Sequence, residues 1–256
     1  MVDTPDMHLV LGSVDDPIGQ WQMDRVFDLL CREAPHHELD TVTCTGLNEL
    51  LEALVSGSID VATCAVDALP ASLPDGVKIN AWLPRGQVEE MLLGCSSLDA
   101  LPTTAPIVAD GLLRRAQILE RCPNAQVQNS SGDIVAALAR LDAGEVSAMV
   151  VPRWELIALC QAYRESVILD PEDFLPSPGQ GVTAVLVRSD SEIHERITKG
   201  MSHAATRIAT QAELVSAAKV DGLVGVVSTL AGEEITMLVK TIDPDGTDAR
   251  LLTETT

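Results

Sequence analysis

Several charged side chains of this sequence have types and positions that could bind or transform a small molecule. Asp67 follows a short apolar segment that predicts a buried strand, and Arg114 and Arg115 begin a predicted helix that comes after another such segment. An acid at the carboxyl end of a parallel strand faces the ligand crevice of an open α/β sheet. Arginines at a helix start strengthen an anion site that backbone amides and the helix dipole already favour. The pattern therefore predicts that Asp67 faces a ligand crevice and that the two arginines favour an anion.

Each of these residues also has an ordinary structural explanation. An aspartate before Ala68 is typical of a capped turn, and the paired arginines are equally typical of a solvated helix face. Asp16 precedes Pro17, which is the usual arrangement of a helix N-cap with proline at the first helical position. On the residues alone, these alternatives stay open.

The six cysteines do not have the spacing of a metal site. No CxxC or Cys/His pattern joins them, and the adjacent His36 and His37 have no partner at i, i+4. In a reducing compartment the simplest interpretation is that they are free and mostly buried thiols. We therefore expect no metal site, and we note that Cys160 is the last cysteine of the chain.

The charge balance excludes two classes of partner. The 256 residues include 38 acids against 17 lysines and arginines, a net charge of −21, and no basic stripe is present. Such a field repels nucleic acid and anionic lipid, so we expect neither nucleic acid nor membrane as a partner. No apolar run approaches the roughly 20 residues of a membrane span, and the first residues lack the basic and apolar regions of a signal peptide. We therefore expect a cytoplasmic protein.

Strand and helix patterns alternate in two successive parts of the chain, which predicts two α/β units with parallel strands. Gly57 and Gly144 follow the last periodic residues of two helices and are expected to stop them. The expected elements are, in order, strand 8–12, a helix from 17 to about 32, strand 39–44, helix 47–54, strand 59–63, strand 106–109, helix 112–121, strand 126–128, helix 134–141, strand 147–151 and helix 154–161.

The remaining segments connect and extend these units. Apolar segments 78–82 and 91–94 are expected to link the units, and the β-branched strand 182–188 is expected to return to the first sheet. The end of the chain predicts a small α+β appendage with a helix from about 206, strands 223–230 and 236–242, and a turn at Asp243–Gly246. Two α/β lobes with crossing connections place a cleft between them, and the ligand is expected there.

Several segments of the sequence are similar to motifs of one enzyme family. Residues 174–181 read FLPSPGQG, which resembles the FLPAPGQG motif of the porphobilinogen deaminase (hydroxymethylbilane synthase) family. Four further matches are Arg114–Leu119 to SLRRQAQL, Arg140–Glu145 to KLDEGEYDA, Pro17–Gln22 to SPLALWQ, and Asp67–Pro70 to HSxKDxP. The order and spacing of the motifs agree over nearly the whole chain.

The resemblance implies a three-domain α/β fold with two lobes of the type II periplasmic-binding-protein kind and a small C-terminal α+β domain. The corresponding boundaries are 1–97 with 182–202 for the first lobe, 98–181 for the second lobe, and 203–256 for the C-terminal domain.

The resemblance also implies roles for particular residues. Asp67 matches the family's catalytic carboxylate, which steadies positive charge on the pyrrole and moves protons during ammonia loss. The residues expected to contact a ligand are Arg114, Arg115, Arg85, Asp16 and Gln180. Asp67, Arg85 and the paired arginines are expected to converge on one locally positive or neutral pocket between the lobes.

The sequence departs from the family's pattern in its basic residues and in its cofactor attachment. The family holds a dipyrromethane cofactor through a thiolate of its third domain, but Leu223 and Val224 stand where that cysteine is expected. We therefore expect no cofactor attachment residue and no covalent dipyrromethane. The lid segment expected between Thr45 and Leu47 is largely missing. Basic residues of the family are replaced at Val14, Val66, Glu89, Ser131, Ala137 and Ala158.

Two functions from different classes follow. The favoured one is a repurposed or inactive family member, a pseudoenzyme that binds a small carboxylate ligand or serves another protein of tetrapyrrole biosynthesis. The alternative is an active, divergent hydroxymethylbilane synthase, a transferase that polymerises porphobilinogen with loss of ammonia on a noncovalent primer or a new anchor. One charge-assisted contact is worth roughly 1.5–3 kcal/mol, so the loss of five would remove most of the affinity for a polycarboxylate chain.

Overall fold

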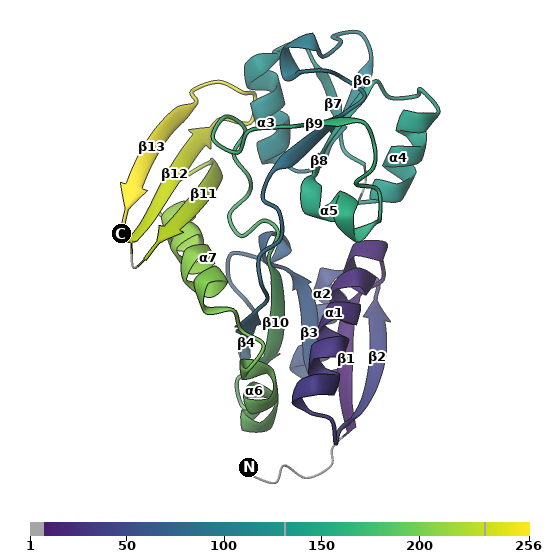
Figure 1. The fold of residues 1–256 in the computed structure, drawn as a ribbon, viewed down its shortest axis with the longest axis vertical. Coiled ribbons are helices and arrows are strands. Elements are labelled where there is room, and N and C mark those ends of the chain that lie inside the picture. Colours follow the sequence, from purple (N-terminus) through teal and green to yellow (C-terminus); the bar gives the residue numbers. More distant parts are fainter. Residues whose placement is uncertain (1–7, 131, 233) are drawn as a thin grey trace. The chain divides into compact units, whose positions relative to one another are not determined.

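The computed structural model describes residues 8–130, 132–232 and 234–256, which form two compact units. The first unit takes the chain up to Gly86 together with Gly181–Ile208, and the second takes Gln87–Gln180 together with Ala209–Thr256. Figure 1 labels the elements of both units. Ser131, one of the positions where a family arginine is replaced, lies outside the described residues.

The first unit contains a five-stranded sheet in the order β2-β1-β3-β10-β4. Strands β1, β2 and β3 are parallel, and β10 is antiparallel to both β3 and β4. Its elements are β1 (His8–Val14), α1 (Pro17–Glu33), β2 (Glu38–Cys44), α2 (Leu47–Ser56), β3 (Val61–Ala65), η1 (Val66–Ala68), β4 (Val77–Trp82), β10 (Thr183–Arg188) and α6 (Glu192–Lys199).

Local signals explain where the helices of this unit begin and end. Asp16 caps α1 and Pro17 is its first residue, while Gly57 ends α2 in the left-handed conformation with φ of 78°. The apolar face of α1, with Val26 and Leu30 fully buried, packs on residues of β1, β3 and β10. β10 is buried along nearly its whole length, as expected for a strand with neighbours on both sides and both faces covered.

The second unit contains a sheet with the same arrangement, in the order β7-β6-β8-β5-β9. The parallel strands β6, β7 and β8 are followed by the antiparallel β5, which occupies the place that β10 has in the first sheet. Its elements are β5 (Glu90–Leu93), η2 (Leu98–Ala100), β6 (Pro106–Ala109), α3 (Leu112–Arg121), β7 (Gln126–Gln128), α4 (Ile134–Asp142), β8 (Ala148–Pro152), α5 (Arg153–Ala158) and β9 (Ser166–Ile168).

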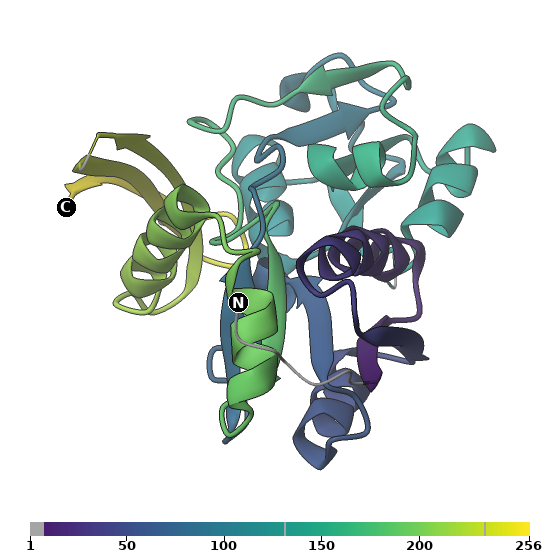
Figure 2. The same cartoon turned by 60° about the horizontal axis from the view of Figure 1, so that its bottom comes forward.

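The second unit also contains a small antiparallel sheet of β11 (Leu223–Ala231), β12 (Glu234–Ile242) and β13 (Arg250–Thr255). Helix α7 (Ala204–Ala217), which contains the boundary between the units, lies along one face of this sheet in Figure 2. Val226, Met237 and Val239 form the core between them, with Ala212 of α7 packed against it.

The predicted fold class is confirmed, and most predicted elements are present within two or three residues of their expected ends. The return of strand 182–188 to the first sheet is also confirmed, because β10 lies between β3 and β4. The elements that were not predicted are α6, β9, β13 and the two short helices η1 and η2. The boundaries proposed for three separate domains stay a prediction. Within the described ranges, no helix combines the length and the apolar character that crossing a membrane requires.

Candidate functional site

In the first unit, three of the predicted site residues follow strands that end at the same edge of the sheet. Asp16 follows β1 and Asp67 follows β3, and these strands are parallel neighbours. Arg85 follows β4, which is parallel to β3 because both are antiparallel to β10. The parallel order of the strands therefore brings one arginine and two carboxylates of the predicted site to one edge.

The structure assigns Asp16 a structural role. Its Oδ1 accepts a hydrogen bond of 2.6 Å from the backbone N–H of Gly19, which is the N-cap interaction that the Asp-Pro pair predicts. The backbone N–H of Arg85 donates to Oγ1 of Thr206 at 3.1 Å, so α7 helps to position the segment that carries this arginine.

Asp67 is half-buried in the short η1 helix directly after β3. Its charge acts on Cys64, which is 4% exposed in β3. Burial, with a smaller contribution from Asp67, raises the pKa of the Cys64 thiol to about 12. Cys64 is therefore a protonated and weakly nucleophilic thiol at neutral pH, despite its position beside the predicted catalytic acid.

In the second unit, Arg114 is held in a fixed position by three groups. Its Nε donates to Oε1 of Glu90 at 2.6 Å, Nη1 donates to the carbonyl of Asp110 at 2.9 Å, and Nη2 donates to Oε1 of Gln180 at 2.9 Å. The side chains of Arg114 and Glu90 are only 12% and 1% exposed. Arg114 and Gln180, both predicted as ligand contacts, are thus brought together, and a buried carboxylate already neutralises the arginine.

The FLPSPGQG segment, residues 174–181, contributes Gln180 to the surroundings of Arg114. Gln180 is fully buried, and its Nε2 donates to the carbonyl of Val88 at 2.8 Å, which fixes the amide that faces Arg114. Gln117 of α3 exchanges hydrogen bonds of 2.8 and 2.9 Å with the backbone of Leu175. Buried amide side chains therefore hold the FLPSPGQG segment in place, Gln117 by bonding it to α3 and Gln180 by bonding it to Val88.

The remaining charges at this strand end are mostly acidic. Glu89 pairs with Arg153 at 3.2 Å, and Asp110 accepts hydrogen bonds from the backbone and hydroxyl of Ser130. Arg115 is exposed on the first turn of α3. The described side chains here include four carboxylates (Glu89, Glu90, Asp110 and Asp133) and three arginines (Arg114, Arg115 and Arg153), so this edge has no excess of positive charge.

The predicted site residues are divided between the two units. Asp16, Asp67 and Arg85 belong to the first unit, and Arg114, Arg115 and Gln180 belong to the second. The convergence of both sets on one pocket stays a prediction.

The residues present do not fit a thioether-linked cofactor. Leu223 and Val224, which the resemblance matches to the family's cysteine, begin β11, and the last cysteine of the given sequence is Cys160. Aliphatic side chains cannot form the covalent bond that a thiolate forms. Among the described residues, no three His, Cys, Asp or Glu side chains are grouped so that they could hold a metal ion.

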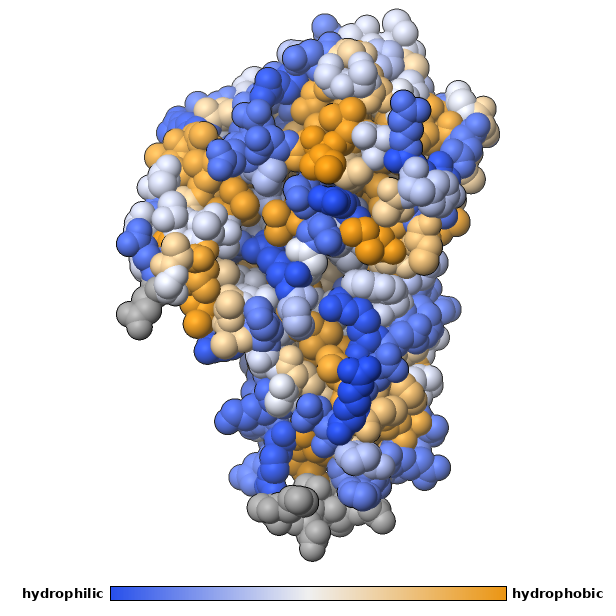
Figure 3. Space-filling model, in the orientation of Figure 1, coloured by the Kyte–Doolittle hydropathy of each residue, from blue (hydrophilic) through white to orange (hydrophobic). Residues whose placement is uncertain are grey.

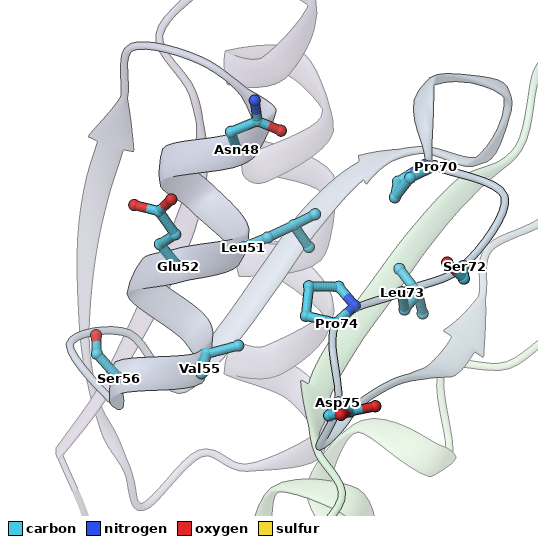
Figure 4. Close-up of a pocket in the computed structure, with 10 residues that line it drawn as sticks. All are labelled: Asn48, Leu51, Glu52, Val55, Ser56, Pro70, Ser72, Leu73, Pro74 and Asp75. Carbon is cyan, nitrogen blue, oxygen red and sulfur yellow. The ribbon is translucent and has the colours of Figure 1, made fainter.

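A separate groove in the first unit has a cavity volume of about 690 Å³. Figure 4 shows it between α2 and the loop 70–75, with Leu51 and Val55 pointing from the helix toward the loop. The charged residues among its described lining are Glu52 and Asp75, and none is basic. This groove therefore does not suit a carboxylate ligand.

Sequence reasoning missed Glu90 and Asp110, the two acids that organise Arg114. Glu90 stands directly before the apolar Met91-Leu92-Leu93 strand, and a charged residue at the start of a buried strand is a signal that it needs a partner. The identity of that partner depends on the pairing of β5 with β8, which places Glu90 opposite Pro152 at the carboxyl end of β8.

The two sheets, with the same strand order and a single antiparallel strand in the same place, define a two-lobed protein of the type II periplasmic-binding-protein class with a small added sheet. An ancestral cationic amino acid solute-binding protein has this fold, with a TM-score of 0.54, 16% identity, and coverage of 82% of this chain and 94% of that chain. A TRAP periplasmic solute-binding protein from Desulfovibrio salexigens aligns with a TM-score of 0.51, 11% identity, and coverage of 84% and 79%.

Within this class, sequence similarity identifies the family. The family model for the dipyrromethane-cofactor-binding domain of porphobilinogen deaminase matches residues 36–196. Porphobilinogen deaminase from Acidithiobacillus ferrooxidans is 29% identical over 226 residues, covering 80% of this chain and 74% of that protein. The enzyme from Nitrobacter winogradskyi is 28% identical over 273 residues, covering 96% and 86%. The chain belongs to the porphobilinogen deaminase family, as its motifs predict.

Proposed function

We propose that this chain is a family member that does not polymerise porphobilinogen and instead binds one small carboxylate ligand. The observation that carries the proposal is the state of Arg114. This arginine matches the family's paired arginines, and here its guanidinium is bonded to the buried Glu90, to Gln180 and to the carbonyl of Asp110. An arginine held in this way can add to the binding of one carboxylate, but most of its charge is already compensated, which disfavours a growing polycarboxylate chain.

The acids around Arg114 support the same conclusion. Porphobilinogen carries an acetate and a propionate, so each added unit would bring two further carboxylates toward an edge that already holds Glu89, Asp110 and Asp133. Like charges in a site of low polarity repel, and the family's compensating basic residues are replaced at several positions. A ligand with one or two carboxyl groups is the largest anion that this charge balance favours.

The proposal includes the absence of a covalent dipyrromethane. No thiol stands in the C-terminal sheet, and Cys64, the thiol near Asp67, is buried with its pKa raised to about 12. We expect the purified protein to have the mass of the bare chain and to give no colour with an aldehyde reagent for pyrroles. A mass increase on any cysteine would overturn this part of the proposal.

Arg115 and Arg114 on the first turn of α3, with Gln180 beside them, are the proposed ligand contacts of the second unit. Asp67 and Arg85 are the candidates from the first unit, because Asp16 caps α1. The helix dipole and backbone amides of α3 add to the attraction for a carboxylate.

Isothermal titration calorimetry tests the ligand class. Simple mono- and dicarboxylates and porphobilinogen are titrated into the wild type, Arg114→Ala, Arg115→Ala and the control Arg121→Ala, which removes an exposed arginine from the other end of α3. We expect a small carboxylate to bind the wild type and Arg121→Ala, and to bind both other variants more weakly. Binding that is unaffected by Arg115→Ala and Arg114→Ala, or no binding of any carboxylate, would contradict the proposal.

One observation favours the alternative, an active divergent hydroxymethylbilane synthase of the transferase class. Asp67 is retained at the end of β3, in the position that matches the family's catalytic carboxylate. Consumption of porphobilinogen with release of ammonia, abolished by Asp67→Asn, would support this alternative and would contradict the favoured function.

A further inference from the structure

The groove beside α2 lies entirely within the first unit. One of its walls is α2, and the other is the loop 70–75 between η1 and β4 (Figure 4). Its volume of about 690 Å³ lies within the range of roughly 300–1,000 Å³ that is typical of small-molecule sites. All of the described residues that line it belong to the first unit. A ligand in this groove is therefore independent of the carboxylate site proposed at Arg114 and Arg115.

The floor of the groove is apolar. Leu51 and Val55 stand one helical turn apart on α2, and Figure 4 shows both pointing toward the loop, where Leu73 lines the opposite side. Leu51 is 4% exposed but Val55 is 48% exposed, so part of this apolar surface is in contact with solvent. The outer face of α1 has the more usual pattern, since Figure 3 shows a band of hydrophilic side chains where Figure 1 draws that helix. An apolar occupant would remove the floor of the groove from water, which is favourable.

Both walls of the groove are held in place by the protein itself. The buried face of α2 packs on the first sheet. In the loop, the N–H of Val77 donates to the carbonyl of Pro74 at 3.1 Å, and the N–H of Ser189 donates to the carbonyl of Gly76 at 2.7 Å. Pro70 and Pro74 restrict the loop further, because the ring of proline fixes φ. A groove that is formed in advance loses little conformational entropy on binding, which favours a small ligand.

The charged groups of the groove are two carboxylates that lack a partner in the described part of the chain. Glu52 of α2 and Asp75 of the loop are exposed, and neither forms an ion pair or a side-chain hydrogen bond with another described residue. Arg188, which donates to the carbonyl of Leu54 near the end of α2, is already paired with Asp60 at 3.5 Å. The groove therefore combines an apolar floor with negative charge that is not compensated.

We propose that this groove binds a small organic cation, an amine whose apolar body covers the floor and whose ammonium group is attracted by Glu52 and Asp75. Charge complementarity selects this class, because both acids repel an anion and neither finds a partner in a neutral ligand. Asn48 and Ser72 line the same groove, and their side-chain oxygens can accept hydrogen bonds from the ammonium group. The net charge of −21 also raises the concentration of cations near the surface.

Three ligands that share one apolar body and differ in charge test this proposal. Naphthylmethylamine is the cation, naphthylmethanol is the neutral analogue, and naphthylacetate is the anion. Each is titrated into the wild-type chain while NMR follows the amide chemical shifts of α2 and of the loop 70–75. We expect the amine to shift these amides and to bind about fivefold more tightly than the alcohol, and naphthylacetate to bind most weakly. Shifts that are confined to other parts of the chain, or an amine that binds no more tightly than the alcohol, would overturn the proposal.

Removal of the two charges tests the role of the acids. The double variant Glu52→Gln, Asp75→Asn should bind the alcohol as the wild type does but the amine about fivefold more weakly, so that the preference for the amine disappears. The control Glu38→Gln, Asp28→Asn removes two exposed acids of the same unit that are not among the described lining of the groove, and it should keep the preference. Loss of the preference in both double variants would show that only the overall charge attracts the amine, and would contradict the proposal.

A substitution at Val55 tests the groove itself. Val55→Arg would place a guanidinium beside Glu52 and cover the apolar floor, so we expect the affinity for the amine to fall by about tenfold. Val42→Arg is the matched control, because Val42 is 43% exposed on β2 of the same unit and is not among the described lining of the groove. Circular dichroism checks that both variants fold. Amine binding that survives Val55→Arg, or that is lost equally in Val42→Arg, would refute the assignment of the site.

Discussion

At the scale of single residues, Arg114 shows how the groups around a side chain determine its chemical state. Glu90 and Arg114 form an ion pair of 2.6 Å in which both side chains are largely removed from solvent. Removing one partner of such a pair leaves the other charge buried without compensation, and that loss costs more than the pair itself contributes. The pair therefore has consequences for stability as well as for ligand binding.

We expect Glu90→Ala to lower the free energy of unfolding by about 3–5 kcal/mol, because Arg114 would remain charged and mostly buried. Urea denaturation followed by circular dichroism measures the change. Glu145→Ala is the matched control, since Glu145 pairs with Arg140 at 3.6 Å on the surface and its loss should cost at most about 1 kcal/mol. Equal effects of the two substitutions would show that Glu90 is effectively solvated.

The thiols provide a second prediction at this scale. The pKa of Cys64 is raised to about 12, so at pH 8 it is protonated and should resist alkylation by iodoacetamide in the folded protein. Cys31 and Cys160 are exposed and should be modified first. Mass spectrometry of digested, alkylated protein gives the order of modification. Early modification of Cys64 would contradict its burial.

At the scale of elements, α6 depends on a buried histidine. His194 is 4% exposed, and its Nε2 lies 3.5 Å from Oδ1 of Asp60. Burial lowers the pKa of His194 from its ordinary value of 6.5; Arg188 acts in the same direction, while Asp60 and Asp190 oppose it. The histidine is therefore held in its neutral form where α6 packs on the first sheet.

This histidine should make stability depend on pH. Because the folded-state pKa of His194 is below the unfolded value, the unfolded chain takes up the proton first as the pH falls below about 6.5, and stability declines from that point. We expect the free energy of unfolding to decline less between pH 7 and pH 5 in His194→Asn than in the wild type. Urea denaturation at each pH measures this free energy. His36→Asn, an exposed control, should keep the wild-type pH dependence. An identical pH profile for the two variants would refute the role of His194.

The geometry of the turn between β12 and β13 requires a glycine. Gly246 has φ of 86°, and a Cβ atom there would lie 2.5 Å from the backbone nitrogen of Glu120 at the end of α3. Gly232 also has a positive φ, 68°, but a Cβ there meets nothing within 4 Å. Comparison of the two positions separates backbone strain from steric contact.

Gly246→Ala should therefore destabilise the protein more than Gly232→Ala. We expect about 1–2 kcal/mol for the backbone strain at Gly232, and a further 1–3 kcal/mol, approximately, at Gly246 because the turn must move away from α3. Thermal unfolding of both variants measures the difference. Similar losses at both positions would mean that the turn relaxes without cost.

At the scale of the whole molecule, the dominant feature is the net charge of −21. Several of the ion pairs are at the surface and contribute little, so repulsion among the unpaired acids opposes the compact state. Screening by salt acts on this repulsion over distances of about 10 Å at an ionic strength of 0.1 M.

The melting temperature should therefore rise when sodium chloride is added to a low-salt buffer at neutral pH, and most of the rise should occur before physiological ionic strength. Differential scanning calorimetry measures the trend. Sucrose at matched osmolality serves as the control for general solvent effects. A melting temperature that falls with salt would show that attractive ion pairs outweigh the repulsion.

The sequence by itself determined the local structure and the family. Helix caps such as Asp16 and helix stops such as Gly57 are local signals, because they act on backbone groups within a few residues. The apolar periodicity of each helix is likewise contained in its own segment. The FLPSPGQG string likewise pointed to the family, because a contiguous string can be matched without knowledge of distant parts of the chain. The replacement of the family's cysteine near Leu223 and Val224 stays a prediction made from the sequence alone.

The tertiary structure alone decided the chemistry of Arg114 and the pairing of β13. Glu90 and Gln180 stand 24 and 66 residues from Arg114 in the chain, and no local pattern links positions so far apart. β13 was missed because its two adjacent leucines lack the alternation of a half-buried strand, and pairing with β12 supplies the order that its own pattern does not specify. Contacts of this kind form only when distant elements pack together. The residues of one segment therefore do not reveal them.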